Sequence, residues 1–149
     1  MNKLFLATTF SGQVNYETGQ VNPVFRESIE AVLKSLRTLG GFSVFCAVEH
    51  EGWKVGDEPP HIGVAKDKAE IDAADGLLAL LQPVPSEGVQ WEIGYATGKK
   101  PVMLAHAPDV TPGYFNQGLI TLGEVSLAIY NDPNELTAGV VTMMGDHSR

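Results

Sequence analysis

Three residues in the second half of the chain combine a helix start that can bind an anion with a nearby carboxylate. Ser86, Gly88 and Glu92 form the pattern S-x-G-x-x-x-E. Serine is favoured immediately before a helix, and glycine allows a ligand to approach the backbone closely. The free N–H groups of a first helical turn bind anions with the help of the helix dipole. We expect the same dipole to keep the Glu92 carboxylate ionised at neutral pH, where it could act as a nucleophile.

A purely structural role also accounts for this pattern. Ser86 would then only cap a helix, and Glu92 would be a solvated acid near the helix start. Serine before a helix and glutamate within one are both common. The spacing by itself therefore leaves the catalytic and the structural interpretation open.

The size and charge of the chain exclude several classes of protein. Its 149 residues predict a single domain, spanning residues 1–149, with room for one hydrophobic core. The formal net charge of -8 argues against a surface that binds a nucleic-acid polymer, because such a surface requires clustered lysine and arginine. A small anionic ligand can still bind to backbone N–H groups.

The composition also bears on location and cofactors. Cys46 is the only cysteine, which excludes an intrachain disulfide and fits a cytoplasmic location. The apolar start of the sequence is interpreted as a first strand rather than a signal peptide, and no apolar stretch is long enough to span a membrane. No histidine or cysteine spacing indicates a metal site, and the glycine fingerprints of dinucleotide and P-loop sites are absent, so we expect no cofactor.

Strand-like and helix-like segments alternate along the sequence, which is typical of a parallel sheet flanked by helices. The apolar runs predict strands at residues 3–8, 42–48, 76–81, 101–106 and 125–130. Periodicity and capping signals predict helices from Pro23 to Gly40, over about 61–74, after Ser86 and from about Pro133. Together these elements predict a single-domain, flavodoxin-like (Rossmann-like), doubly wound five-stranded parallel sheet. In such sheets, ligands bind beyond the carboxyl ends of the strands, where the strand order reverses.

The segment "DGLLALLQPVPSEGVQWEIGYATGKKPVMLAH", residues 75–106, resembles the core of the nucleoside 2-deoxyribosyltransferase superfamily. The shared pattern is an apolar strand, a turn with glycine, the sequence E-I-G-Y-A at residues 92–96, and G-K-K-P at residues 98–101. The resemblance extends to "LFLATTFSG" near the start and to "AKDKAEIDAAD" before the third strand, so it covers most of the chain.

The resemblance implies catalytic roles for two carboxylates. In the superfamily the matched glutamate, here Glu92, attacks the anomeric carbon of the sugar and forms a covalent glycosyl-enzyme. In the superfamily a second carboxyl group, from the helix before the third strand, acts as general acid or base. Asp67 is the best match for it in this sequence, and Asp72 is the alternative. The chemistry is that of a retaining glycosidase.

The position of Ser86 divides the superfamily. Deoxyribosyltransferases usually carry aspartate there, whereas the nucleoside 5'-monophosphate N-glycosidases carry serine, which suits a phosphate. The resemblance therefore favours hydrolysis of a nucleoside 5'-monophosphate to free base and sugar 5-phosphate, with a small-molecule nucleotide or nucleoside as partner. Glu87 does not fit a phosphate site as well as Ser86 does. Its negative charge would repel the phosphate unless its side chain faces solvent. The alternatives are a nucleoside 2-deoxyribosyltransferase that exchanges bases and a non-catalytic nucleotide-binding sensor.

The resemblance also implies substrate contacts near the end of the first strand. Phe5 matches an aromatic residue that lies near the sugar in the resembling glycosidases, and Ala7 and Thr8 follow it. Thr8, Thr9 and Ser11 match a loop that approaches base and sugar. Each of these residues has an ordinary structural interpretation as well, Phe5 as a core residue and the others as loop residues.

Four further residues are weaker candidates. Trp53 could stack on a base or pack on its own fold, and His50 could donate a proton or be solvated. Members of the superfamily are dimers or larger, so we expect a homodimer or higher homo-oligomer, with Asn116 as a candidate phosphate contact from the neighbouring subunit. Tyr95 lies three residues after Glu92 and could hold its carboxylate or fill the core.

Overall fold

The computed structural model describes residues 2–9 and 12–147, so the expectation for Ser11 lies outside the described residues. One parallel sheet with the strand order β2-β1-β3-β4-β5 forms the centre of the molecule. Its strands are β1 (Lys3–Thr8), β2 (Ser43–Cys46), β3 (Gly76–Leu80), β4 (Val102–His106) and β5 (Ser126–Ile129). The predicted flavodoxin-like, doubly wound five-stranded parallel sheet is confirmed.

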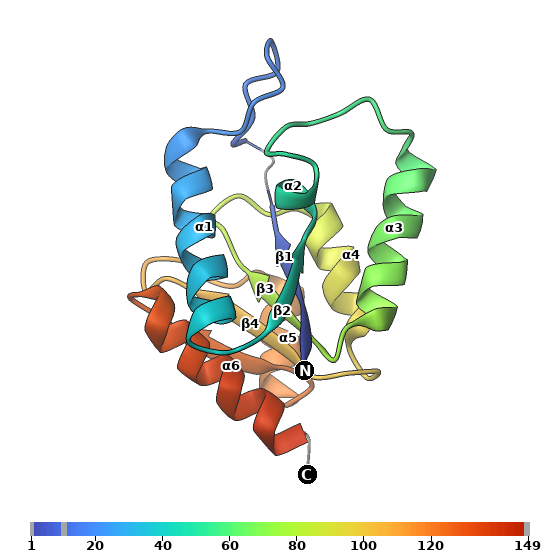
Figure 1. The fold of residues 1–149 in the computed structure, drawn as a ribbon. Helices are drawn as coiled ribbons and strands as arrows, with labels where there is room; N and C mark the ends of the chain where they lie inside the picture. The colour runs from blue at the N-terminus through green and yellow to red at the C-terminus, as the bar shows by residue number, and fades with distance from the viewer. Residues whose placement is uncertain (1, 10–11, 148–149) are drawn as a thin grey trace.

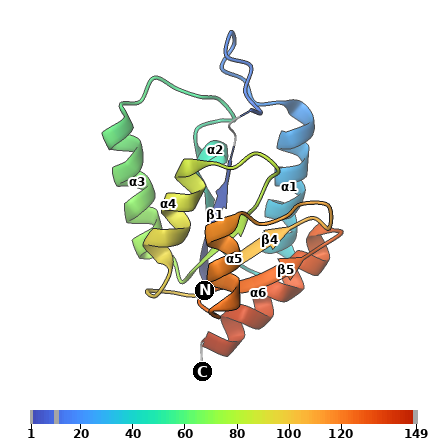
Figure 2. The same ribbon diagram turned by 180° about the vertical axis from the view of Figure 1, so that it is seen from behind.

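Helices cover both faces of this sheet (Figures 1 and 2). They are α1 (Pro23–Thr38), α2 (Ala47–His50), α3 (Pro60–Ala73), α4 (Glu87–Ala96), α5 (Tyr114–Thr121) and α6 (Pro133–His147). Helices α1 and α6 pack together over one face, and α3, α4 and α5 cover the other. None of the helices within residues 2–9 and 12–147 has the length and apolar character that crossing a bilayer requires.

The two faces of β3 explain its unbroken apolar sequence. Leu78 and Leu80 pack in the core cluster under α1 and α6, whereas Leu77 and Ala79 pack in the cluster under α3 and α4. Successive side chains of a strand point to opposite faces, and here both faces are covered by helices. The strand therefore has no polar position.

Two short helices differ from the sequence-based expectation. The second strand stops at Cys46 and the chain turns into α2, and the N–H of Trp53 then donates to the carbonyl of Val48 at 2.9 Å. Helix α5 follows Gly113, which has no side chain with which to cap it. In contrast, the expected cap Asn22 accepts from two N–H groups at the start of α1.

The connections determine where a ligand can bind. The chain leaves β1 for one edge of the sheet and, after β2, crosses back to β3 on the other side of β1. The strand order therefore reverses between β1 and β3, and a crevice is expected beyond their carboxyl ends. Loops after β1, β2 and β3 all emerge at that end of the sheet (Figure 1).

Candidate active site

The start of α4 lies at the carboxyl end of β3 and has the predicted cap. The Ser86 hydroxyl oxygen accepts the N–H of Val89 at 3.3 Å, and the Ser86 carbonyl accepts the N–H of Gln90 at 3.1 Å. The N–H groups of Glu87 and Gly88 precede these and have no partner within the helix. They are therefore available to an anion in the crevice.

Glu92 is buried because it lies next to the apolar face of the same helix. Val89, Ile93 and Ala96 pack in the core cluster against β1, β3 and β4, and Ile93 is completely buried. Glu92 precedes Ile93, and only 8% of its surface is exposed. It is therefore not the solvated acid of the structural interpretation.

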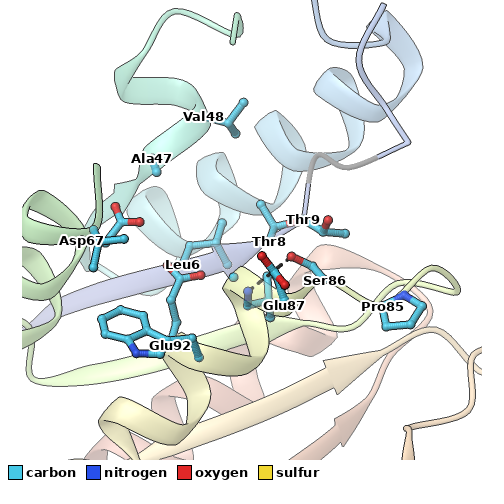
Figure 3. A pocket seen from close by; sticks show the side chains of 14 residues that line it. Leu6, Thr8, Thr9, Ala47, Val48, Asp67, Pro85, Ser86, Glu87 and Glu92 are labelled. Carbon is cyan, nitrogen blue, oxygen red and sulfur yellow. Dashed lines mark hydrogen bonds between the residues drawn. The ribbon is translucent and has the colours of Figure 1, made fainter. Parts of the chain in front are cut away.

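A cavity of about 970 Å³ opens in front of this helix. Its lining includes Thr8, Asp67, Ser86, Gly88, Trp91 and Glu92. Figure 3 shows Asp67, from α3, and Ser86, at the start of α4, on opposite sides of the view. The structure thus brings both predicted catalytic carboxylates and the predicted anion-binding helix start to one cavity.

Burial controls the protonation of the two carboxylates. Burial first, and the Asp67 charge second, raise the pKa of Glu92 from 4.5 to about 8. Burial first, followed by the charges of Glu51 and Glu58, raises the pKa of Asp67 from 3.8 to about 6. The expectation that the helix dipole keeps Glu92 ionised in the free protein is therefore wrong, because desolvation outweighs the dipole at this depth.

The pair holds one proton between about pH 6 and pH 8. Since two interacting carboxylates titrate as a unit, this proton can reside on Glu92 or on Asp67. The form with Glu92 ionised and Asp67 protonated contains one nucleophile and one general acid. Such a division of roles between two carboxylates is the arrangement that glycosidic bond cleavage requires.

The same burial predicts a pH-dependent stability. Because the pKa of Glu92 is higher in the folded protein than its ordinary value of 4.5, its stabilising contribution is complete below about pH 4.5 and is lost as the pH rises to about 8. We expect the free energy of unfolding to fall over this range by on the order of a few kcal/mol. Urea unfolding at a series of pH values measures this fall. In Glu92→Gln the decline should be shallower, and equal slopes in both proteins would contradict the assignment.

Three predicted substrate contacts lie in the core rather than in the cavity, which corrects those predictions. Phe5 and Ala7 point to the face of the sheet that α3 and α4 cover and are buried in that cluster. The alternation of β1 instead directs Leu6 and Thr8 to the cavity. Trp53 is buried in the cluster under α1, with the Arg26 guanidinium 5.2 Å from its ring centroid.

The remaining candidates also lie outside the lining of this cavity. Asn116 is buried, accepts from Gln90 at 3.0 Å and lines a smaller cavity of about 320 Å³, so its contact across a dimer stays a prediction. His50 packs against the ring of Phe45. The Tyr95 hydroxyl donates to Asp72 at 2.6 Å and not to Glu92.

Trp91 and Glu87 are among the lining residues to which sequence reasoning assigned no substrate contact. Trp91 forms part of the wall, and its position next to Glu92 in the motif was the only available signal. Glu87 is exposed, yet its side chain also lines the cavity beside Thr8 and Ser86 (Figure 3). Its charge therefore faces the proposed phosphate position instead of pointing away from it.

Thr8 has an unmet hydrogen-bonding group at this site. Its hydroxyl oxygen is buried and has no hydrogen-bond partner among the described residues. Buried hydroxyls normally find a partner, because an unsatisfied one costs about 1–3 kcal/mol. In the part of the chain that the structure describes, no three histidine, cysteine, aspartate or glutamate side chains gather as metal ligands would.

Several solved structures share this architecture, although neither a family model nor a curated protein sequence matches the chain. The solution structure of BlsM superposes with a TM-score of 0.81 at 26% identity, covering 99% of this chain and 94% of BlsM. The CMP N-glycosidase BcmB from Clostridium botulinum gives 0.65 at 24%, covering 93% and 97%. A 2-deoxyribosyltransferase from Bacillus psychrosaccharolyticus gives 0.63 at 23%, covering 91% and 90%.

Fold and site define an α/β protein with paired carboxylates at the switch point of a doubly wound sheet. The chain has the fold of the nucleoside 2-deoxyribosyltransferase-like superfamily, as the sequence motif indicated.

Proposed function

We propose that the protein hydrolyses the N-glycosidic bond of a nucleoside 5'-monophosphate and releases free base and sugar 5-phosphate. The observation that carries this proposal is the lining of one cavity by Asp67, Glu92 and the capped start of α4. The similar structures named as a CMP N-glycosidase and a 2-deoxyribosyltransferase support an enzyme of this class.

The two carboxylates have complementary roles in this reaction. The ionised Glu92 attacks the anomeric carbon while Asp67 gives its proton to the departing base, so the C–N bond breaks as a glycosyl ester forms. Asp67 then takes a proton from water, and the resulting hydroxide releases the sugar and regenerates Glu92. The cycle needs no group beyond water and the singly protonated pair.

The phosphate would bind at the start of α4. Because the Ser86 oxygen accepts the N–H of Val89, its own proton is free to be donated to a phosphate oxygen. The N–H groups of Glu87 and Gly88 and the positive end of the helix dipole add to this attraction. Thr8, at the end of β1, lines the same cavity beside this helix start.

Ser86→Ala tests the phosphate contact. The change removes a hydrogen bond to a charged group, worth about 1.5–3 kcal/mol, so we expect the Kd for a nucleotide to rise roughly 10-fold to 100-fold. The Kd for the matching nucleoside should hardly change. Calorimetric titration of both ligands measures this difference, with Ser28→Ala on α1 as a control distant from the cavity. Equal losses for nucleotide and nucleoside would show that Ser86 does not contact phosphate.

The function itself is tested with a panel of nucleosides and 5'-monophosphates, in ribose and deoxyribose forms. Each is incubated with the protein, with and without a second free base, and base release is followed by chromatography. Release from monophosphates without an acceptor base supports the proposal. No release from any substrate, together with nucleotide binding that survives Glu92→Ala, would instead indicate a non-catalytic sensor.

Glu87 favours a second candidate, the nucleoside 2-deoxyribosyltransferase. Its carboxylate lines the cavity beside Ser86, where it can accept a hydrogen bond from a sugar 5'-hydroxyl and would repel a 5'-phosphate. The same panel separates the candidates. A transferase would act on nucleosides and would form a new nucleoside only when an acceptor base is present.

We further propose that the protein is a homodimer in the cytoplasm. Tyr114, Phe115 and Leu122, on and next to α5, are each more than 70% exposed, with exposed fractions of 86%, 74% and 76%. These three side chains line one open hollow, and an exposed apolar surface of this kind is typical of an interface. The free Cys46 thiol fits a reducing compartment. Sedimentation equilibrium would measure the mass in solution.

A further inference from the structure

The helix that carries Asp67 has little apolar attachment to the rest of the molecule. Helix α3, all of which lies within the described residues, buries only Ile71, whereas Ile62 and Val64 are exposed. Ile71 lies one helical turn after Asp67 on the same face, so it directs that face toward α4 and the sheet. One buried side chain fixes a helix poorly, because the helix can still pivot about it.

Two polar contacts at the far end of α3 restrict this pivoting. The Tyr95 hydroxyl, from α4, donates to the Asp72 carboxylate at 2.6 Å. The Lys100 ammonium, after α4, donates to the carbonyls of Ile71, Asp72 and Ala74, with the last at 2.6 Å. These carbonyls belong to the end of α3, where carbonyls lack helical partners and a cation is favoured.

The Tyr95 ring is itself held in place. It stacks on Trp91 with a centroid distance of 5.2 Å, and the Lys99 ammonium lies 3.6 Å from its centroid. The Asp72 carboxylate raises the pKa of the Tyr95 phenol through their hydrogen bond, so the hydroxyl stays protonated and donates. Since Trp91 also lines the cavity, a continuous set of contacts joins the cavity wall to the end of α3.

We propose that Tyr95, Asp72 and Lys100 are positioning residues that hold α3 against α4 and thereby keep the Asp67 carboxylate opposite Glu92. The two carboxylates lie on different helices, and each helix extends from the cavity to this junction (Figures 1 and 2). A small rotation of α3 moves Asp67 away from the departing base. Catalysis is sensitive to such shifts, since a displacement of about 1 Å can cost roughly 100-fold in rate.

This inference rests on the proposed roles of Asp67 and Glu92, and Tyr95→Phe tests it. The variant keeps the stacked ring and removes only the hydroxyl. We expect kcat to fall roughly 10-fold to 100-fold with KM unchanged, because Asp67 is misplaced while the phosphate contacts persist. Asp72→Ala should give the same loss and should add nothing to Tyr95→Phe. Asp72→Asn should retain activity, since its amide oxygen can still accept from Tyr95.

A second readout requires no substrate. Carbon-13 NMR titration of the carboxyl groups should show the pKa of Glu92 falling below about 8 in Tyr95→Phe, because the Asp67 charge moves away while burial still keeps this pKa raised. Tyr130→Phe, which alters a half-buried tyrosine packed on the other core cluster, is the matched control. Wild-type kcat and an unshifted titration in Tyr95→Phe, or fully additive losses with Asp72→Ala, would overturn the inference. Absence of turnover in the unaltered protein would refute the proposed function alone, and the titration would still decide this inference.

Discussion

Glu92→Gln is expected to lower kcat by at least roughly 10⁴-fold, because the amide has the shape of the carboxyl group but cannot form the glycosyl ester. The cavity should keep its form, since a neutral amide takes the place of a group whose pKa is raised to about 8 by burial. Nucleotide affinity should therefore change little. Steady-state kinetics and calorimetric titration measure the two quantities on the same preparation.

The covalent step provides a direct check on this expectation. Mass spectrometry of the unaltered protein, quenched during turnover, should show a sugar phosphate attached to the peptide that contains Glu92. The same peptide from Glu92→Gln should carry no addition. Glu124→Gln, which alters an exposed glutamate beyond α5, should behave like the unaltered protein. Near-normal turnover in Glu92→Gln would show that Glu92 is not the nucleophile.

Asp67→Asn is expected to lower kcat by roughly 10²-fold to 10⁴-fold, the usual contribution of a general acid or base. The unaltered protein should show a bell-shaped dependence of kcat/KM on pH, with limbs near the pKa values of about 6 and about 8. Below the lower value both carboxyl groups are protonated and no nucleophile exists. Above the higher value both are ionised and no acid remains.

The variant should change the shape of this profile. Without Asp67, no group is left to lose its proton at high pH, so the alkaline limb should disappear. The remaining acidic limb should then report the pKa of Glu92 alone, which lies below about 8 without the Asp67 charge but stays above its ordinary value of 4.5 because of burial. A nitrophenolate leaving group departs without being protonated. With a sugar 5-phosphate that carries this group, the first step, formation of the glycosyl ester, should be nearly as fast in Asp67→Asn as in the unaltered protein.

Another aspartate provides a matched control for the Asp67→Asn experiment. Asp109→Asn removes an exposed carboxylate in the loop after β4, distant in sequence from both catalytic helices, and should leave the profile unchanged. If Asp67→Asn kept the bell shape, or lost activity equally on both leaving groups, the acid would have to be another residue. Asp72 is a poor substitute, since its carboxylate is bonded to Tyr95 outside the lining of the cavity.

Local sequence patterns predicted most of the fold, because the interactions that start or extend these helices and strands involve residues close together in the sequence. The apolar run at β3, the Asn22 cap of α1 and the Ser86 cap of α4 all rely on neighbours within one or two turns. The short helices α2 and α5 had no such signal. Neither has a side chain that caps its start, and the backbone contact to α2 comes from Trp53, which follows the helix.

The site required more than these patterns. The motif located Glu92 and Ser86. The resemblance at the first strand also indicated Phe5, and its aromatic ring made Trp53 a candidate, but strand alternation and core packing place both away from the cavity. Neither the side to which a strand residue points nor the tertiary burial of a loop residue is encoded by its type. The sequence also did not determine whether the Glu87 side chain faces the cavity or the solvent, because an exposed residue at a helix start can point to either.

The sequence by itself determined a doubly wound sheet and a helix start that suits an anion, followed by a carboxylate at residue 92. Only the tertiary structure decided that Asp67 faces the same cavity as Glu92 and that the pair retains one proton near neutral pH. The physical reason is that desolvation and charge interaction depend on distances between α3 and α4. Those distances arise from packing across the sheet and from contacts between residues far apart in the chain.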